Sequence, residues 1–365
     1  MRRFLGEKLV GTFAFALLIR YNEPRVIIAI APCVSGDRER NLGVIALKIL
    51  KSIGFRTLTV ATALAAVIGA QGSVAMAADG MADFRAAYAV AAQDNRAYAV
   101  EIDLLGPAFH ADVETVGEIR TNGFVWLGGS LEWDYTDHQT GTTVHKDIPL
   151  YLERNAGSLD FYGQRGNSWY EDSFVGLPLW LISTITSRDK AVLDKNMAAV
   201  KEVEVLQETD ATKVLRLIFD KEALAAMIRA HEGSPNFDAA GQVFAEYLAQ
   251  GAAATDLTCD VTVKRATNEI VTISADLTKL MQNYAQSLLQ GSYQEKVTLT
   301  DADKALLQAL GYYCNLRVYA SATNAATNGH FAQAKAYASD VKGAQKAAGG
   351  FLKDLEQEAV SSSVK

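Results

Sequence analysis

The chain contains one sequence pattern twice: VKEVEVLQETDATKVLRLIFDKEALAAMI at residues 200–228 and LTCDVTVKRATNEIVTISADLTKLMQNYA at residues 257–285. Each copy alternates apolar and polar residues through two short runs with a turn between them, which is typical of antiparallel strands. Each then reaches an aspartate, Asp220 or Asp276, followed by apolar residues at helical spacing. Aspartate is favoured at helix N-caps because its carboxylate accepts hydrogen bonds from the first turn. The pattern therefore predicts two strand–turn–strand–helix units and an α+β fold.

Upstream of these units lies a long region of alternating apolar and polar residues, from about residue 97 to residue 171. Its hairpin-type breaks fall at residues 106–107, 121–123, 137–141, 155–157 and 165–167. This spacing predicts five or six antiparallel strands in a meander. Helical patterns occur at about residues 80–95, 188–200, 236–251 and 301–310, and a last strand-like run at 312–322. We therefore expect a single domain over residues 78–322, with one strongly curved antiparallel sheet of about ten strands and helices on one face.

Aromatic residues are concentrated in the strand-rich third of the chain. Gly128 and Gly129 interrupt the alternation of the third strand and predict a β-bulge there. Such a bulge would place Phe124, Trp126, Leu131, Trp133 and Tyr135 on one face. The candidate lining of an apolar ligand cavity consists of Phe124, Trp126, Trp133, Phe161, Trp169 and Trp180. The alternative interpretation is that these aromatics form an ordinary core.

Residues 48–77 have the pattern of a secretory signal peptide. Lys48, Lys51 and Arg56 precede an uncharged run of small apolar residues, and Ala75 and Ala77 form the small-x-small pattern that predicts cleavage after Ala77. The run is too rich in Ala, Thr and Gly to favour a membrane anchor. We interpret residues 44–77 as the signal peptide. Residues 1–43 are then either an over-extended start or a long leader.

Charge divides unevenly along the chain, which has 365 residues and a net charge of −7. The first 77 residues hold 10 Lys and Arg against 4 Asp and Glu, so the remaining 288 residues carry −13. A nucleic-acid binder would show a basic surface instead, and this class of function is not expected. The basic, apolar leader also accounts for a mean hydropathy of +0.04.

Two of the three cysteines remain after the leader, Cys259 and Cys314, and both lie in strand-like runs. An even number of cysteines in an oxidising compartment permits one disulfide, provided that the two strands are neighbours. The alternative is a pair of separate buried thiols.

Few polar residues suggest chemistry. His110, Asp112 and Glu114 share one face of a strand, and Asp134, Asp137, His138 and His145 gather near a hairpin tip. Either set could bind a metal, but an exposed strand face and an ordinary turn explain them equally well. The sequence contains no G-x-S-x-G, Walker A, G-x-G-x-x-G, H-E-x-x-H or C-x-x-C motif. We therefore expect no enzyme activity, no metal site and no cofactor.

Three stretches carry a family resemblance: IPLYLERNAGSLDFYGQRGNSWY at residues 148–170, VLRLIFDKEALAAMI at 214–228 and LTCDVTVKRATNEIVTISADLTKL at 257–280. In this order, behind a signal peptide, they resemble the exported half-barrel proteins of the outer-membrane lipoprotein carrier superfamily (LolA/LppX type), and within it an exported family of Firmicutes-type bacteria. The resemblance implies a curved half-barrel whose concave face is covered by helices and holds lipid or acyl chains. The chain differs by its helix at 236–251, its Ala/Lys-rich tail at 323–365 and the lack of a lipid-attachment cysteine.

The expected function is therefore that of a non-enzymatic exported protein of the periplasm, cell envelope or exterior that binds a lipid or another hydrophobic ligand. The alternative is a structural or interaction protein with a filled core and an envelope protein as partner. A metal-dependent hydrolase is a third reading. Contact with the membrane is expected only transiently, through the leader. The tail at 323–365 is expected to be a helical or disordered, loosely attached appendage.

Overall fold

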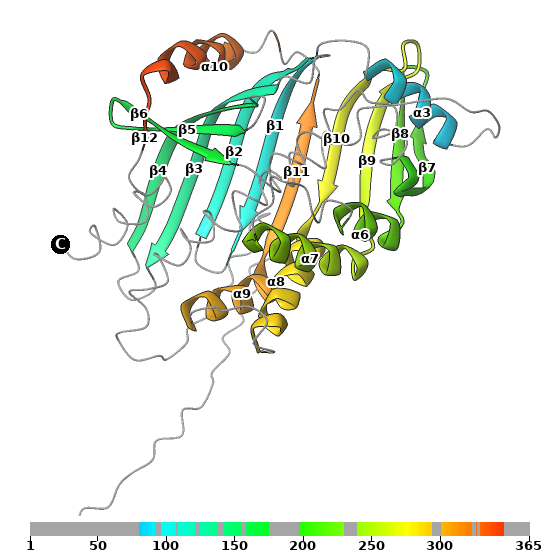
Figure 1. Cartoon of the computed structure of the whole chain (residues 1–365). Helices are drawn as coiled ribbons and strands as arrows, with labels where there is room; N and C mark the ends of the chain where they lie inside the picture. The colour runs from blue at the N-terminus through cyan, green and yellow to red at the C-terminus, as the bar shows by residue number, and fades with distance from the viewer. Residues whose placement is uncertain are drawn as a thin grey trace, which may run out of the picture.

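The computed structural model describes residues 80–91, 96–106, 109–120, 125–137, 142–154, 158–174, 197–229, 239–293, 301–322, 326 and 329–346. These residues form one 12-stranded sheet with the order β12-β6-β5-β4-β3-β2-β1-β11-β10-β9-β8-β7 (Figure 1). All neighbouring strands are antiparallel except β12 and β6, which are parallel. The expected single curved sheet with helices is confirmed, and the parallel edge strand makes it a mixed sheet.

Two runs of hairpins build the sheet. The first run is β1 (Arg96–Leu105), β2 (Phe109–Ile119), β3 (Val125–Asp137), β4 (Thr142–Arg154), β5 (Leu159–Arg165) and β6 (Ser168–Phe174). The second is β7 (Val200–Glu208), β8 (Thr212–Phe219), β9 (Thr258–Lys264) and β10 (Ile270–Asp276). A late strand, β11 (Asn315–Ser321), pairs with β1 on one side and β10 on the other. It joins the two runs into one sheet.

The helices lie on both sides of the sheet. They are α3 (Gly80–Ala91), α6 (Lys221–Arg229), α7 (Ala239–Ala253), α8 (Thr278–Tyr293), α9 (Asp301–Tyr313) and α10 (Gly329–Asp340), the last followed by a 3-10 turn, η3 (Val341–Gly343), and β12 (Gln345–Lys346). On the concave side, α3 packs beside β7 and β10, α6 to α9 contact one another in sequence, and α8 lies beside β11. No helix among the described residues is long and apolar enough to span a membrane.

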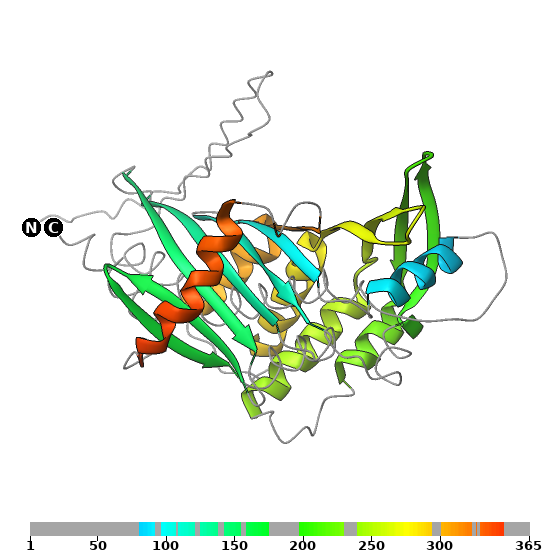
Figure 2. The ribbon, with the colours of Figure 1, turned by 90° about the horizontal axis from the view of Figure 1, so that it is seen from above.

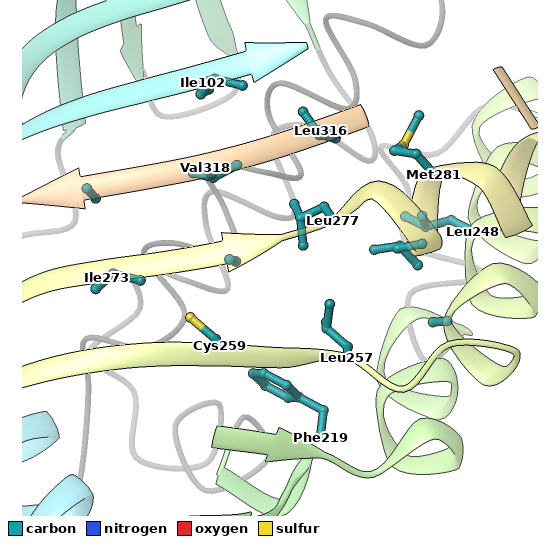
Figure 3. Close-up of a cluster of buried hydrophobic side chains, with 14 of the residues drawn as sticks. Ile102, Phe219, Leu248, Leu257, Cys259, Ile273, Leu277, Met281, Leu316 and Val318 are labelled. Carbon is teal, nitrogen blue, oxygen red and sulfur yellow. The ribbon is translucent and has the colours of Figure 1, made fainter. Parts of the chain in front are cut away.

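The main core fills the space between the sheet and the helices α3, α6, α7, α8 and α9. Figure 3 shows its centre, where Leu316 and Val318 of β11 lie near Ile102 of β1 and Leu277 at the start of α8. Each of these side chains is at most 2% exposed. Alternation along the strands therefore directs their apolar residues to this side, as the sequence pattern predicts.

The predicted N-cap of α6 is confirmed, since the backbone N–H of Ala223 donates to Asp220 Oδ1 at 2.7 Å and the Asp220 carbonyl accepts the first helical hydrogen bond, from Leu224. At α8 the prediction is wrong by one residue, because the first helical hydrogen bond runs from Met281 to the carbonyl of Leu277. Asp276 still accepts a hydrogen bond from the N–H of Thr278 at 2.9 Å, so each carboxylate satisfies a first-turn N–H that has no partner within its helix.

The predicted bulge in β3 is wrong. The pairing of β3 with β2 and β4 runs through Gly128 and Gly129 without a shift of register. Close approaches explain the two glycines instead, because a Cβ on Gly128 would lie 3.0 Å from Ala334 of α10, and one on Gly129 would overlap the carbonyl oxygen of Glu114. With no bulge, Trp126 lies on the opposite face from Leu131 and Trp133.

The expected disulfide is not formed. Cys259 in β9 and Cys314, which precedes β11, are both free and buried. The physical reason is strand order, since β10 separates β9 from β11. Burial raises the pKa of the Cys314 thiol to about 12, and burial together with nearby Asp260 raises the pKa of Cys259 further. The alternative of two separate buried thiols is what the structure shows.

Residues 326 and 329–346 of the tail are among the described residues. α10 crosses the side of the sheet opposite the main core, over β2, β3 and β4 (Figure 2). β12 then extends the sheet beyond β6 (Figure 1). The leader, including Ala75 and Ala77 of the predicted cleavage site, lies outside the described residues.

We expect Asp220→Ala to lower the free energy of unfolding by about 1 kcal/mol, because it removes the N-cap of α6. Urea denaturation followed by circular dichroism measures this change. Asp210→Ala, in the exposed turn between β7 and β8, is the matched control and should shift the free energy by less than about 0.5 kcal/mol. Equal effects of the two substitutions would contradict the capping role.

Candidate functional site

The concave side of the first strand run carries a continuous apolar surface. Cross-strand pairing places Ala111 of β2 beside Trp133 of β3, and Val113 beside Leu131. Leu131 in turn faces Ile148 of β4. The apolar side chains of this surface are Ala111, Val113, Leu131, Trp133, Ile148, Leu150 and Phe161, all part of the main core cluster. They form the candidate ligand surface, which we call the concave apolar surface.

The predicted lining residues do not come together. Trp133 and Phe161 belong to the concave apolar surface, where they are 4% and 1% exposed. Trp126 and Trp169 are buried on the opposite face, in a second cluster beneath α10. Phe124 and Trp180 lie outside the described residues. An uninterrupted strand alternates its faces, so the even-numbered Trp126 and the odd-numbered Trp133 of β3 point in opposite directions.

The second cluster is a row of aromatic rings that crosses β3 to β6. The rings of Trp126 and Tyr151 lie 6.3 Å apart between centroids, and those of Tyr151 and Tyr162 lie 6.0 Å apart. Trp169 of β6 completes this aromatic row. Trp126 Nε1 donates to Glu118 at 3.3 Å and the Tyr151 hydroxyl donates to Glu153 at 3.2 Å. The polar atoms of Trp126 and Tyr151 therefore have carboxylate partners although both rings are buried.

Helix α10 fits this row closely. Phe331 lies 5.2 Å from Trp126 between ring centroids, and Tyr337 lies 5.0 Å from Trp169. Ala334, halfway between them in sequence, packs against Gly128. The spacing of Phe331, Ala334 and Tyr337 puts them on one side of a helix. Sequence reasoning missed this site because the stripe is short and lies in an alanine-rich segment.

The same outer face of β1 to β4 also carries rows of carboxylates. Glu101 faces Glu114, and Asp112 faces Asp103 on one side and Glu132 on the other. Burial, followed by the charge of Glu114, raises the pKa of both Glu101 and Asp112 above its ordinary value. The outer face of β1, β2 and β3 is therefore acidic where these carboxylates meet. Like charges directly opposite one another destabilise a sheet, so this arrangement lowers the stability of the fold.

Two histidines lie within this acidic face. His110 Nε2 is 2.9 Å from Asp103 Oδ1, and His145 Nδ1 is 2.7 Å from Asp134 Oδ1. His110, Asp112 and Glu114 do share a strand face, as expected, but His110 is paired with a carboxylate of the neighbouring strand. His138 lies outside the described residues. Among the described residues, no group of three His, Cys, Asp or Glu side chains is arranged to hold a metal ion.

No family model matches the chain, and no curated protein matches it. A search of solved structures finds LprF from Mycobacterium bovis, which is 10% identical in sequence. The match covers 66% of this chain and 89% of that chain, with a TM-score of 0.31. At this TM-score the likeness carries no argument about function.

We expect Asp112→Asn to raise the free energy of unfolding at pH 7 by about 0.5 kcal/mol, because it removes a charge that faces two other carboxylates. Since the pKa of Asp112 is raised in the folded protein, the folded state holds the proton more tightly than the unfolded state. Stability is thus lost as the pH rises from the ordinary pKa of 3.8 through the folded pKa. The advantage of Asp112→Asn should accordingly disappear below about pH 4, as measured by urea denaturation at several pH values.

Asp260→Asn is the matched control on the outer face of the second strand run. Asp260 accepts hydrogen bonds from Arg216 Nε and Nη2 at 2.8 and 2.9 Å. Its replacement should lower the stability at pH 7, the opposite sign from Asp112→Asn. Destabilisation by both substitutions would contradict the view that repulsion dominates around Asp112.

Proposed function

We propose that the chain is an exported, non-enzymatic protein of the cell envelope that binds the acyl chain of a lipid or a similar apolar ligand at its concave apolar surface. The observation that carries the proposal is the continuous apolar stripe across β2 to β5, on strands whose outer face is acidic. Each methylene group removed from water contributes about 0.8 kcal/mol, so an acyl chain could be held by burial alone.

A second candidate function is that of a structural or interaction protein whose core is complete. It is favoured by the burial of Trp133 and Phe161, which protein contacts alone reduce to 4% and 1% exposure. In this case the partner would be another protein of the envelope, and the concave apolar surface would serve only stability.

Native mass spectrometry and solvent extraction of purified residues 78–365 distinguish the two functions. We expect a co-purifying lipid and saturable uptake of a fluorescent fatty acid. Trp133→Ala should weaken fatty-acid binding at least fivefold, whereas Trp126→Ala, an equally large truncation on the opposite face, should leave the Kd unchanged. A clean mass of the protein alone, together with no fatty-acid uptake, would refute ligand binding and favour the structural role.

Export is tested by N-terminal sequencing of the protein recovered from outside the cytoplasm. We expect Ala78 as the first residue, because the Ala75 and Ala77 pattern directs cleavage after Ala77. The described fold begins two residues later with α3, whose Gly80 packs against Val203 of β7. Recovery of peptides from residues 4–40 in the exported protein would overturn the assignment of the leader.

A further inference from the structure

Residues 329–346, comprising α10, η3 and β12, form a strap across the outer face of the sheet. Its apolar side chains that pack in the cluster of the aromatic row are Phe331, Ala334, Tyr337, Ala338, Val341 and Ala344. β12 then pairs Gln345 with Tyr170 and Lys346 with Glu171 of β6. The strap thus covers two features at once, the aromatic row and the edge of the sheet.

The strap is attached more weakly than the rest of the fold. The cluster beneath it is separate from the main core, and within α10 only Ala334 is buried. The strand contribution is a two-residue pairing. Elements with few buried apolar contacts open at a lower free-energy cost than global unfolding. Release of the strap can therefore occur while the main core stays folded.

Release of the strap would expose apolar rings and an unpaired strand edge, both of which favour binding of another segment. Trp126, Tyr151, Tyr162 and Trp169 would form an exposed aromatic patch, and β6 would become an open edge. Exposed apolar patches and open strand edges both favour association with another chain. The best-fitting occupant is a helix with an aromatic, a small residue and an aromatic at three-residue intervals, followed by an extended segment.

Charge favours the strap sequence itself. Residues 329–346 carry Lys335, Lys342 and Lys346 against the single acidic Asp340. The aromatic row and its surroundings carry Glu118, Asp147, Glu153 and Glu171, of which Glu118 is already paired with Arg120 at 3.0 Å. Burial and the nearby charge of Asp147 raise the pKa of Tyr337, which places this carboxylate close to the seated strap. A basic segment is thus drawn to an acidic face.

We propose that the aromatic row and the β6 edge are an exchange site that accepts the strap of a second copy of the chain. Exchange preserves the contacts between strap and sheet, because the strap of one copy replaces that of the other. The balance between monomer and exchanged dimer then depends on the protein concentration. The chain's own strap competes at a high effective concentration and keeps the site closed in dilute solution. This inference does not depend on a ligand at the concave apolar surface.

A labelled peptide of residues 326–346 serves as the probe for a second strap. Phe331→Ala/Tyr337→Ala weakens the resident strap but leaves the aromatic row intact, so this variant should bind the peptide at least tenfold more tightly than the unchanged chain. Gly128→Val displaces the resident strap but also blocks the place where Ala334 of any strap must pack, so this variant should show no binding. Equal binding by the two variants would overturn the aromatic row as the binding site.

A second test locks the strap with a disulfide. Glu171→Cys/Lys346→Cys joins two directly paired positions of β6 and β12. The native thiols do not compete, because both are buried with raised pKa values. Oxidation in dilute solution should abolish peptide binding, and reduction should restore it. Oxidation at high protein concentration should give a dimer on a non-reducing gel.

The two readouts separate the parts of the inference. Unchanged peptide binding after oxidation in dilute solution would overturn the strap as the element that closes the site. Peptide binding with no cross-linked dimer at any concentration would overturn the second copy as the occupant.

Discussion

Uninterrupted alternation from β1 through β6 is the constraint on which the rest of the structure depends. The pairs between these strands run without a change of register, whereas β7 and β10 contain shifts. One extra residue in β3 would exchange the faces of every side chain beyond it. An extra residue at Gly128 or Gly129 would thus turn Trp133 out of the core to the face that carries Trp126. The unbroken register thus creates both the concave apolar surface and the aromatic row on the other side.

The outer face of the sheet changes character along its width. In the second strand run, opposite charges face each other, as in Arg216 and Asp260, and Thr272 donates to Thr262 at 2.7 Å. In the first run, carboxylates face carboxylates, as in Glu101 and Glu114. Opposite charges across neighbouring strands stabilise a sheet, whereas like charges directly opposite one another destabilise it. The acidic half is also the half over which the basic strap lies, so the energetic cost of repulsion falls where a positively charged segment is bound.

Local patterns were sufficient to predict the strands of the meander, the two repeated units and the Asp220 cap, because neighbours in sequence determine each of them. They failed where distant contacts decide. Gly128 and Gly129 have the pattern of a bulge, and only the approach of Ala334 and of the Glu114 carbonyl explains them. Cys259 and Cys314 lie in strand-like runs, but whether they meet depends on the position of β10 between those strands. The strap was missed for the same reason, since its stripe has meaning only beside the aromatic row.

The position of β11 has a consequence for the order in which the chain can fold. Residues 315–321 occupy the middle of the sheet, yet in sequence they follow every described strand except β12. A chain that emerges from its N-terminus presents β1 and later β10 with one edge unpaired until β11 arrives. Such edges are templates for pairing with other chains, so a nascent copy is most exposed to aggregation just before its last central strand appears. The two halves of the sheet can therefore be joined only after most of the chain has been synthesised.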